Sequence, residues 1–250
     1  MKHCAYCGRE CAPTKEHIWP STLIKKYEKL KTFNKRTQSF HGAAPVIKDV
    51  CSTCNNEKLS ALDGYLSDLF DAHLAKPLLP GEEANLSYDY DLLLRGLLKI
   101  SYNSARANAD KVVANALGKH RNYILDGGHC SGVMLRLQVV TASKILVNGK
   151  LTGDLMPVSQ LRVGEMAYDG KLYKRFIVRM VGINSFWFYL VISLKPEPRH
   201  KWKEFVTHFS NWQTPYGIEL QRNKLKVHIP VNQTTYMHPS LLGVLLHAKR

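Results

Sequence analysis

The chain has 250 residues, of which 45% are hydrophobic, and a formal net charge of +15. This composition is enough to fill a globular core, and no apolar run approaches the ~20 residues that a membrane-spanning helix needs. No apolar run follows a basic start, so we expect no secretory signal and a cytoplasmic location. In that reducing compartment, the six cysteines are expected to be metal ligands or free thiols rather than disulfides.

The positive charge is concentrated in the two end portions of the chain. Residues 1–58 contain 11 Lys and Arg against 5 Asp and Glu, and residues 121–250 contain 18 against 7. The middle portion, 59–120, contains 6 against 8. This distribution favours a polyanionic partner, most simply nucleic acid, because contacts of Lys and Arg with phosphates release counterions. A charge that only keeps the chain in solution is the alternative.

The first predicted feature along the chain is a metal-binding frame. Two C-x2-C pairs, each able to present two thiolates on one side of a tight turn, predict a tetrahedral structural zinc site. The pairs are Cys4 with Cys7 and Cys51 with Cys54. Gly8 suits the turn after the first pair. Cys11 is the alternative to one of these four ligands, and Cys130 has no partner at a useful spacing.

Zinc binding would bring two polar segments together, T-K-E-H-I-W-P at 14–20 and N-N-E-K at 55–58. The carboxylate of Glu16 and the amide oxygen of Asn55 suit a hard divalent cation such as Mg²⁺. A neutral His17 beside that cation can take a proton from the water that attacks a phosphodiester. Lys58 lies one helical turn after Asn55, where its ammonium can stabilise developing phosphate charge.

These motifs together resemble the HNH, or ββα-metal, endonucleases of the four-cysteine zinc type. The resemblance is carried by C-x2-C-G, E-H-I-x-P and V-C-x-x-C-N-N-x-K, and it covers roughly residues 1–65. It implies that His17 is the general base, that Glu16 and Asn55 bind a catalytic Mg²⁺ or Mn²⁺, and that Lys58 contacts phosphate. It also favours DNA over RNA as the substrate.

Two departures from the family pattern leave alternatives open. The acid is Glu where Asp is commoner. The family's usual asparagine before the third cysteine, which braces the loop carrying the histidine, is replaced by Val46. The nearest polar residues to that place are His41, Lys48 and Asp49. Asn56 is an alternative to Asn55 as a ligand, or a helix cap.

The segment between the two cysteine pairs predicts one amphipathic helix over residues 21–40. The apolar residues that recur there at helical spacing are Leu23, Ile24, Tyr27, Leu30 and Phe33. The other face is rich in lysine, and it would follow a DNA backbone. A solvated face with no partner is the equal alternative.

The remaining chain predicts helices followed by strands. Residues 57–75 continue a helix from the second cysteine pair, and the segment 76–83, with its prolines and glycine, ends it. Residues 90–120 are helical in pattern, with a break near Asn108. After Gly128, apolar runs separated by N-G and D-G turns predict antiparallel strands, with 176–194 as a buried hairpin. One face of this sheet is expected to be basic.

The sequence therefore predicts an α+β fold with two domains. Residues 1–75 would form a zinc-stapled ββα-metal module, and residues 84–250 would form helices and an antiparallel β-rich domain that docks substrate or a protein partner. The predicted function is metal-dependent endonuclease hydrolysis of DNA. The alternatives are a zinc-stabilised nucleic-acid-binding protein that does not cleave, and a nuclease subunit that a protein partner licenses. No membrane partner is expected.

Overall fold

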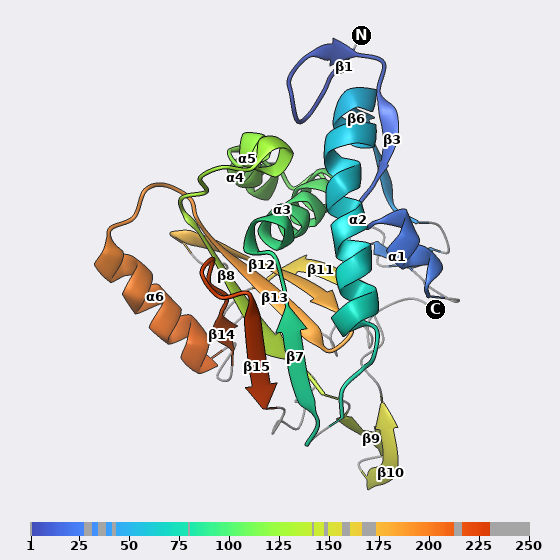
Figure 1. Ribbon diagram of the computed structural model, residues 1–250, viewed down its shortest axis with the longest axis vertical. Coiled ribbons are helices and arrows are strands. Elements are labelled where there is room, and N and C mark those ends of the chain that lie inside the picture. The colour runs from blue at the N-terminus through green and yellow to red at the C-terminus, as the bar shows by residue number, and fades with distance from the viewer. Residues whose placement is uncertain are drawn as a thin grey trace.

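The fold combines helices with antiparallel sheets. The computed structural model describes residues 2–27, 32–34, 39–41, 44–79, 81–141, 143–147, 150–156, 161–166, 174–212 and 217–230 (Figure 1). Every strand pair in these ranges is antiparallel, which confirms the predicted mixed class with antiparallel sheets. Across these ranges, we find no helix with the length and apolar character needed to span a membrane.

The N-terminal part contains two strand pairs and a long helix. β1 (Lys2–His3) pairs with β2 (Glu10–Cys11), and β3 (Thr14–His17) pairs with β6 (Val46–Val50). The helix consists of the π-helical segment η1 (Cys54–Leu59), α2 (Ser60–Leu69) and the π-helical segment η2 (Phe70–Leu74). Its buried side carries Leu59, Leu62, Leu66 and Leu74, as the apolar spacing after the second cysteine pair predicts.

The single helix predicted over residues 21–40 is wrong. Helix α1 (Ser21–Lys25) is short, and two strands follow it, β4 (Thr32–Asn34) and β5 (Ser39–His41), which pair with each other. A helix within a protein gains most of its stability from packing an apolar face, and Leu23 is the only residue of α1 that is fully buried. Thr32 and Phe33 also favour strands over helices.

The middle of the chain is helical, as predicted. β7 (Glu83–Ser87) leads into α3 (Tyr90–Ala107), α4 (Lys111–Gly118) and α5 (Arg121–Asp126). The break predicted near Asn108 is confirmed, because α3 ends before it and Asp110 caps α4 by accepting from Val113 N. Ala109 between them has a φ of 55°, a left-handed conformation that ends a helix.

The C-terminal half is built on a five-stranded sheet with the order β11-β12-β13-β8-β14. Its strands are β8 (Val133–Val139), β11 (Leu161–Glu165), β12 (Phe176–Ile183), β13 (Phe186–Ser193) and β14 (Ile218–Glu219). A separate hairpin joins β9 (Ser143–Val147) to β10 (Lys150–Met156), and β15 (Lys226–Pro230) pairs with β7. The predicted buried hairpin is confirmed as β12 and β13, in which Ser193 is the only residue that is not fully buried.

Both faces of the five-stranded sheet are covered in its centre. Helix α3 packs on one face, and α6 (Arg199–Trp212) packs on the other through Phe209 and its neighbours (Figure 1). The arginines that we expected to form a basic face are therefore inside: Arg136 is 8% exposed and Arg179 is 4% exposed. Burial lowers the pKa of Arg179 to about 10. These central strands do not offer a basic surface to nucleic acid.

One hydrophobic core extends across the predicted domain boundary at 76–83. It contains residues of the cysteine-bearing segment, of α2 and α3, and of strands β8, β12 and β13. At the contact between the helices, a Cβ on Gly96 of α3 would lie 2.9 Å from Leu66 Cδ1 of α2. The absence of a Cβ on Gly96 leaves room for the buried Leu66 side chain between the two helices. The division into two domains stays a prediction.

Candidate functional site

The four predicted cysteines converge on one point. The Sγ atoms of Cys4, Cys7, Cys51 and Cys54 all lie within 4.8 Å of one another. The β1–β2 turn carries the first pair, and the second pair lies where β6 ends and the long helix begins. Four thiols at this separation can bind a metal ion such as zinc. Cys11 is not a member of this group, although it is close enough for the cluster to raise its pKa, an effect secondary to that of burial.

Backbone hydrogen bonds hold the cysteine turns so that the four sulfur atoms face one another. Gly8 has a φ of 74°, and its N–H donates to Cys4 O at 2.9 Å. Cys51 N donates to Cys4 Sγ, and Cys54 N donates to Cys51 Sγ, each at 3.4 Å. The first turn is fixed to β6 because Ala5 N donates to Asp49 O at 2.8 Å.

The thiols of the cluster do not ionise alike. Burial opposes ionisation of Cys7, but hydrogen bonds from Arg9 and the neighbouring thiols lower its pKa to about 6. Burial, together with the adjacent sulfurs, raises the pKa of Cys54. Adjacent thiolates repel one another, and a metal cation bound among them removes that repulsion. This donor set fits a divalent, thiophilic metal ion.

His17 is the last residue of β3, where it pairs with Val46 of β6. Successive side chains on a strand point to opposite faces. The Glu16 side chain is directed inward and is 3% exposed, whereas Lys15 is exposed and His17 is half-buried. The histidine therefore lies on the side of β3 that also carries Lys15.

Asn55 places the start of the long helix against β3. Its Nδ2 donates to Thr14 Oγ1 at 2.8 Å and to Lys15 O at 3.0 Å. The predicted Asn55 is thus beside the strand that carries Glu16 and His17, although 41 sequence positions separate it from Thr14. The alternative residue, Asn56, is exposed, and its carbonyl accepts from Ser60 Oγ.

Glu16 has an ammonium group as its partner. Its Oε1 lies 2.7 Å from Lys99 Nζ and accepts from Asn103 Nδ2 at 3.0 Å. Lys99, which is 0% exposed, also pairs with Asp63 at 2.6 Å. Burial raises the pKa of Glu16, and the Lys99 charge opposes that rise.

Glu16 and Asn55, in the arrangement described above, do not form a binding site for a divalent cation. A divalent ion needs carboxylate oxygens that are free to coordinate it, and Glu16 is buried and paired with Lys99. Within the described ranges, the four cysteines are the only group of three or more His, Cys, Asp or Glu residues whose ligand atoms converge. The assignment of Glu16 and Asn55 to a catalytic Mg²⁺ or Mn²⁺ stays a prediction.

Lys58 contacts the end of α5. Its ammonium forms an exposed ion pair with Asp126, and hydrogen bonding to that carboxylate raises the pKa of Lys58. A nucleic-acid phosphate would have to compete with Asp126 for this ammonium.

Sequence reasoning missed the polar residues of α3 that face the cysteine-bearing segment. Lys99, Asn103 and Arg106 follow one another at spacings of four and three, which places them on one side of the helix. The sequence L-L-K-I-S-Y-N-S-A-R does contain a signal for them, because polar residues recur at helical spacing within an otherwise apolar stretch.

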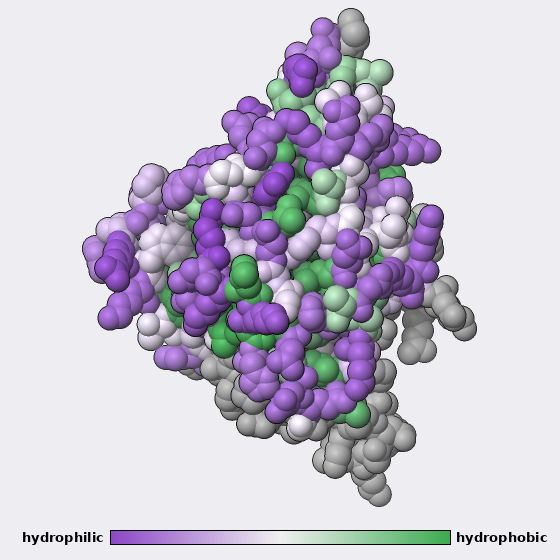
Figure 2. All heavy atoms as spheres, in the orientation of Figure 1, coloured by the Kyte–Doolittle hydropathy of each residue, from purple (hydrophilic) through white to green (hydrophobic). Residues whose placement is uncertain are grey.

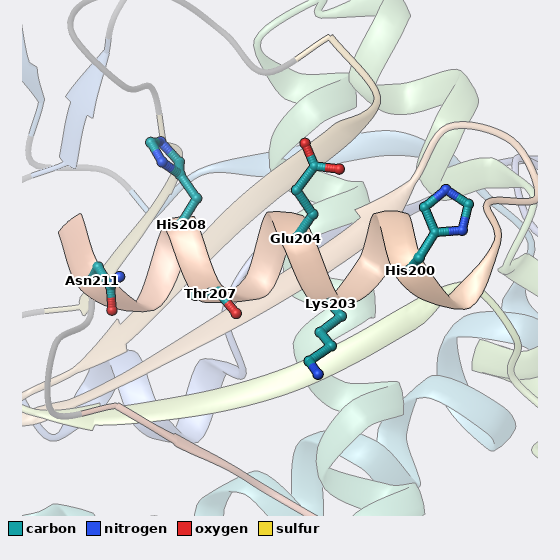
Figure 3. Close-up of a pocket in the computed structure, with 6 residues that line it drawn as sticks. All are labelled: His200, Lys203, Glu204, Thr207, His208 and Asn211. Carbon is teal, nitrogen blue, oxygen red and sulfur yellow. The ribbon is translucent and has the colours of Figure 1, made fainter.

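The structure has a second surface feature on α6. An open groove of about 480 Å³ runs along it, lined by His200, Lys203, Glu204, Thr207, His208 and Asn211. His200, Glu204 and His208 project from the same side of the helix, and Lys203 projects from another (Figure 3). Helix α6 lies at the opposite edge of the molecule from β3 and α2 (Figure 1). No residue singled out from the sequence for catalysis or metal binding lines this groove.

Comparison with protein families, curated proteins and solved structures gives no match. Any functional assignment therefore depends on the motif residues and on the geometry described above.

Proposed function

We propose that the chain is a nuclease that hydrolyses phosphodiester bonds of DNA, with His17 as the general base. The cysteine cluster would hold zinc in a structural role, because a site with four thiolate ligands leaves no position for a reacting water. The two strands β3 and β6 and the helix that begins at Cys54 would form the ββα-metal arrangement to which the motifs are similar.

The observation that carries this proposal is the contact of Asn55 with β3. It joins the C-N-N-E-K segment to the E-H segment through hydrogen bonds to Thr14 and Lys15. The two segments that carry the motif are therefore side by side in the fold, and each adjoins a pair of the four converging cysteines.

The chain's own residues account for two parts of the reaction. A neutral His17 takes a proton from the attacking water. The exposed lysines 15 and 48 offer charge to the phosphate backbone, and Lys58 does so if it leaves Asp126. We derive no step through Mg²⁺ or Mn²⁺, because Glu16 is occupied by Lys99.

A plasmid-cleavage assay tests the proposal. Zinc-loaded protein is incubated with supercoiled plasmid, with Mg²⁺, with Mn²⁺, and with neither. We expect cleavage by the wild type, and a loss of about 10²- to 10⁴-fold in His17→Ala, the usual contribution of a general base. His129→Ala is the matched control, since His129 is exposed and lies outside the N-terminal segment. Equal cleavage by wild type and His17→Ala would refute the assignment.

A second candidate function is nucleic-acid binding without cleavage. The buried pair of Glu16 with Lys99 favours it, because that pair leaves no free carboxylate for a metal at the histidine strand. Salt-dependent DNA binding by the wild type, with no cleavage under any of the metal conditions, would support this function.

A further inference from the structure

Helix α3, and not the strand opposite, provides the side-chain contact to the backbone at His17. His17 pairs with Val46, whose side chain has no polar atom. On the far side, Asn103 Nδ2 donates to His17 O at 3.2 Å, across 86 sequence positions. The carbonyl at the end of β3 is therefore held by a residue that lies outside the cysteine-bearing segment.

The Asn103 amide can take only one orientation. Its Nδ2 donates to Glu16 Oε1 as well as to His17 O, and its Oδ1 accepts from Tyr6 Oη at 2.6 Å and from Arg106 Nη2 at 2.7 Å. A guanidinium only donates and a backbone carbonyl only accepts, so a flipped amide would lose both of these contacts. Asn103 is also 0% exposed, so water cannot replace them.

The same amide is linked to the first cysteine turn. The Arg106 guanidinium lies 4.1 Å from the ring centroid of Tyr102 and 5.0 Å from that of Tyr6. Tyr102 Oη donates to Ala5 O at 3.1 Å. Tyr6 and Ala5 both lie between Cys4 and Cys7, so α3 holds the metal-binding turn and the histidine strand through one connected set of contacts.

We infer that Asn103 is a positioning residue for His17, because its buried amide fixes the backbone from which the imidazole projects. The inference rests on the proposed role of His17 as general base. A shift of about 1 Å in a reacting group can cost about 10²-fold in rate. Loss of such a brace lowers kcat rather than substrate binding.

The test compares Asn103→Asp with Ser101→Ala in the full-length, zinc-loaded protein. The aspartate keeps the shape and the acceptor for Arg106 but removes both N–H donors, and it places a buried carboxylate oxygen against Glu16 Oε1 and His17 O. Ser101 lies on the same helix and is fully buried, and its hydroxyl has no hydrogen-bond partner among the residues that the structure describes, so its removal controls for general loosening of α3. We expect Asn103→Asp to lower kcat by about 10- to 100-fold with KM and bound zinc unchanged. We expect Ser101→Ala to behave as wild type.

Two further measurements keep the inference decidable. Nuclear magnetic resonance of the His17 imidazole should show changed ring resonances in Asn103→Asp and not in Ser101→Ala. If Asn103→Asp does not fold, Asn103→Ser replaces it in the measurements of kcat and of the His17 resonances. In the wild type, slow exchange of the Asn103 side-chain amide protons reports the contact directly.

The outcomes separate this inference from the proposed function. Wild-type kcat and unchanged His17 resonances in Asn103→Asp would overturn the inference, as would an equal fall in kcat in Ser101→Ala. A wild type that does not cleave DNA overturns the proposed function instead. In that case the His17 resonances alone decide whether Asn103 positions the histidine.

Discussion

Lys99 is the buried counter-ion of two carboxylates, Glu16 and Asp63. Its ammonium is fully buried between Glu16 and Asp63, whose side chains are 3% and 25% exposed. Taking these charges out of water is costly, and their mutual attraction offsets that cost only while every partner is present. Removing one partner leaves a buried charge alone, so the three side chains depend on one another.

Replacing Lys99 by methionine is expected to destabilise the protein strongly. The methionine side chain fills a similar volume but leaves Glu16 without a counter-ion. Breaking a buried ion pair in this way lowers the free energy of unfolding by about 3–5 kcal/mol. Glu16→Gln in the same molecule should recover part of that loss. Urea unfolding of the zinc-loaded single and double variants measures both effects.

Lys111→Met is the matched control for that substitution. Lys111 is exposed in the first turn of α4, so the same change there should alter stability by only a few tenths of a kcal/mol. A Lys99→Met protein as stable as Lys111→Met would show that the buried pair is not needed for the fold.

At the scale of secondary-structure elements, α3 is the helix that connects the two halves of the chain. Its N-cap is Asp89, whose carboxylate accepts from Leu92 N at 2.9 Å. Its buried side contacts α2, the β3 strand and the five-stranded sheet. The position of this one helix therefore affects the cysteine turn, the histidine strand and the sheet together.

Asp89→Ala is expected to reduce the free energy of unfolding by about 1 kcal/mol, because the helix start loses an acceptor for one of its free N–H groups. Asp89→Asn keeps an acceptor and should lose less. Thermal or urea unfolding gives the comparison. Asp68→Ala, at an exposed position within α2, removes the same carboxylate without removing a cap, so a loss of equal size there would contradict the capping argument.

What the sequence could predict follows from how local each feature is. Each C-x2-C pair, the break between α3 and α4 and the buried β12–β13 hairpin depend on spacing, capping and turn residues that lie close together. The meeting of the two cysteine pairs, with 47 positions between Cys4 and Cys51, could be predicted because four thiolates suit one metal ion. The helix expected over 21–40 failed because helical spacing alone does not supply a surface to pack against. The pairing of Glu16 with Asn103 joins positions 87 apart, and no local pattern specifies which distant side chain enters a buried network.

At the scale of the whole molecule, polar groups cover a core that is shared by both halves. The face shown in Figure 2 is mostly hydrophilic, with hydrophobic residues scattered among the polar ones, as expected for an ordinary surface. Beneath it, one hydrophobic core extends from Cys4 in the first cysteine turn to Leu220 after β14. Helix α6, which carries the groove, lies across the molecule from β1 and β3 (Figure 1).

A fragment containing residues 1–75 is therefore expected not to fold independently, even with zinc bound. It would expose Leu62 and Leu66, which are both 0% exposed in the whole chain, and it would lose Lys99 as the partner of Glu16. Metal binding stabilises the cysteine turns, but it does not replace the apolar surface that α3 supplies. Nuclear magnetic resonance of the zinc-loaded fragment should show well-dispersed amide signals only for residues near the cysteines, and its thermal unfolding should show no cooperative transition. Dispersed signals throughout 1–75, with a transition as sharp as that of the full chain, would instead establish this segment as a domain and reduce α3 to a neighbour that packs against it.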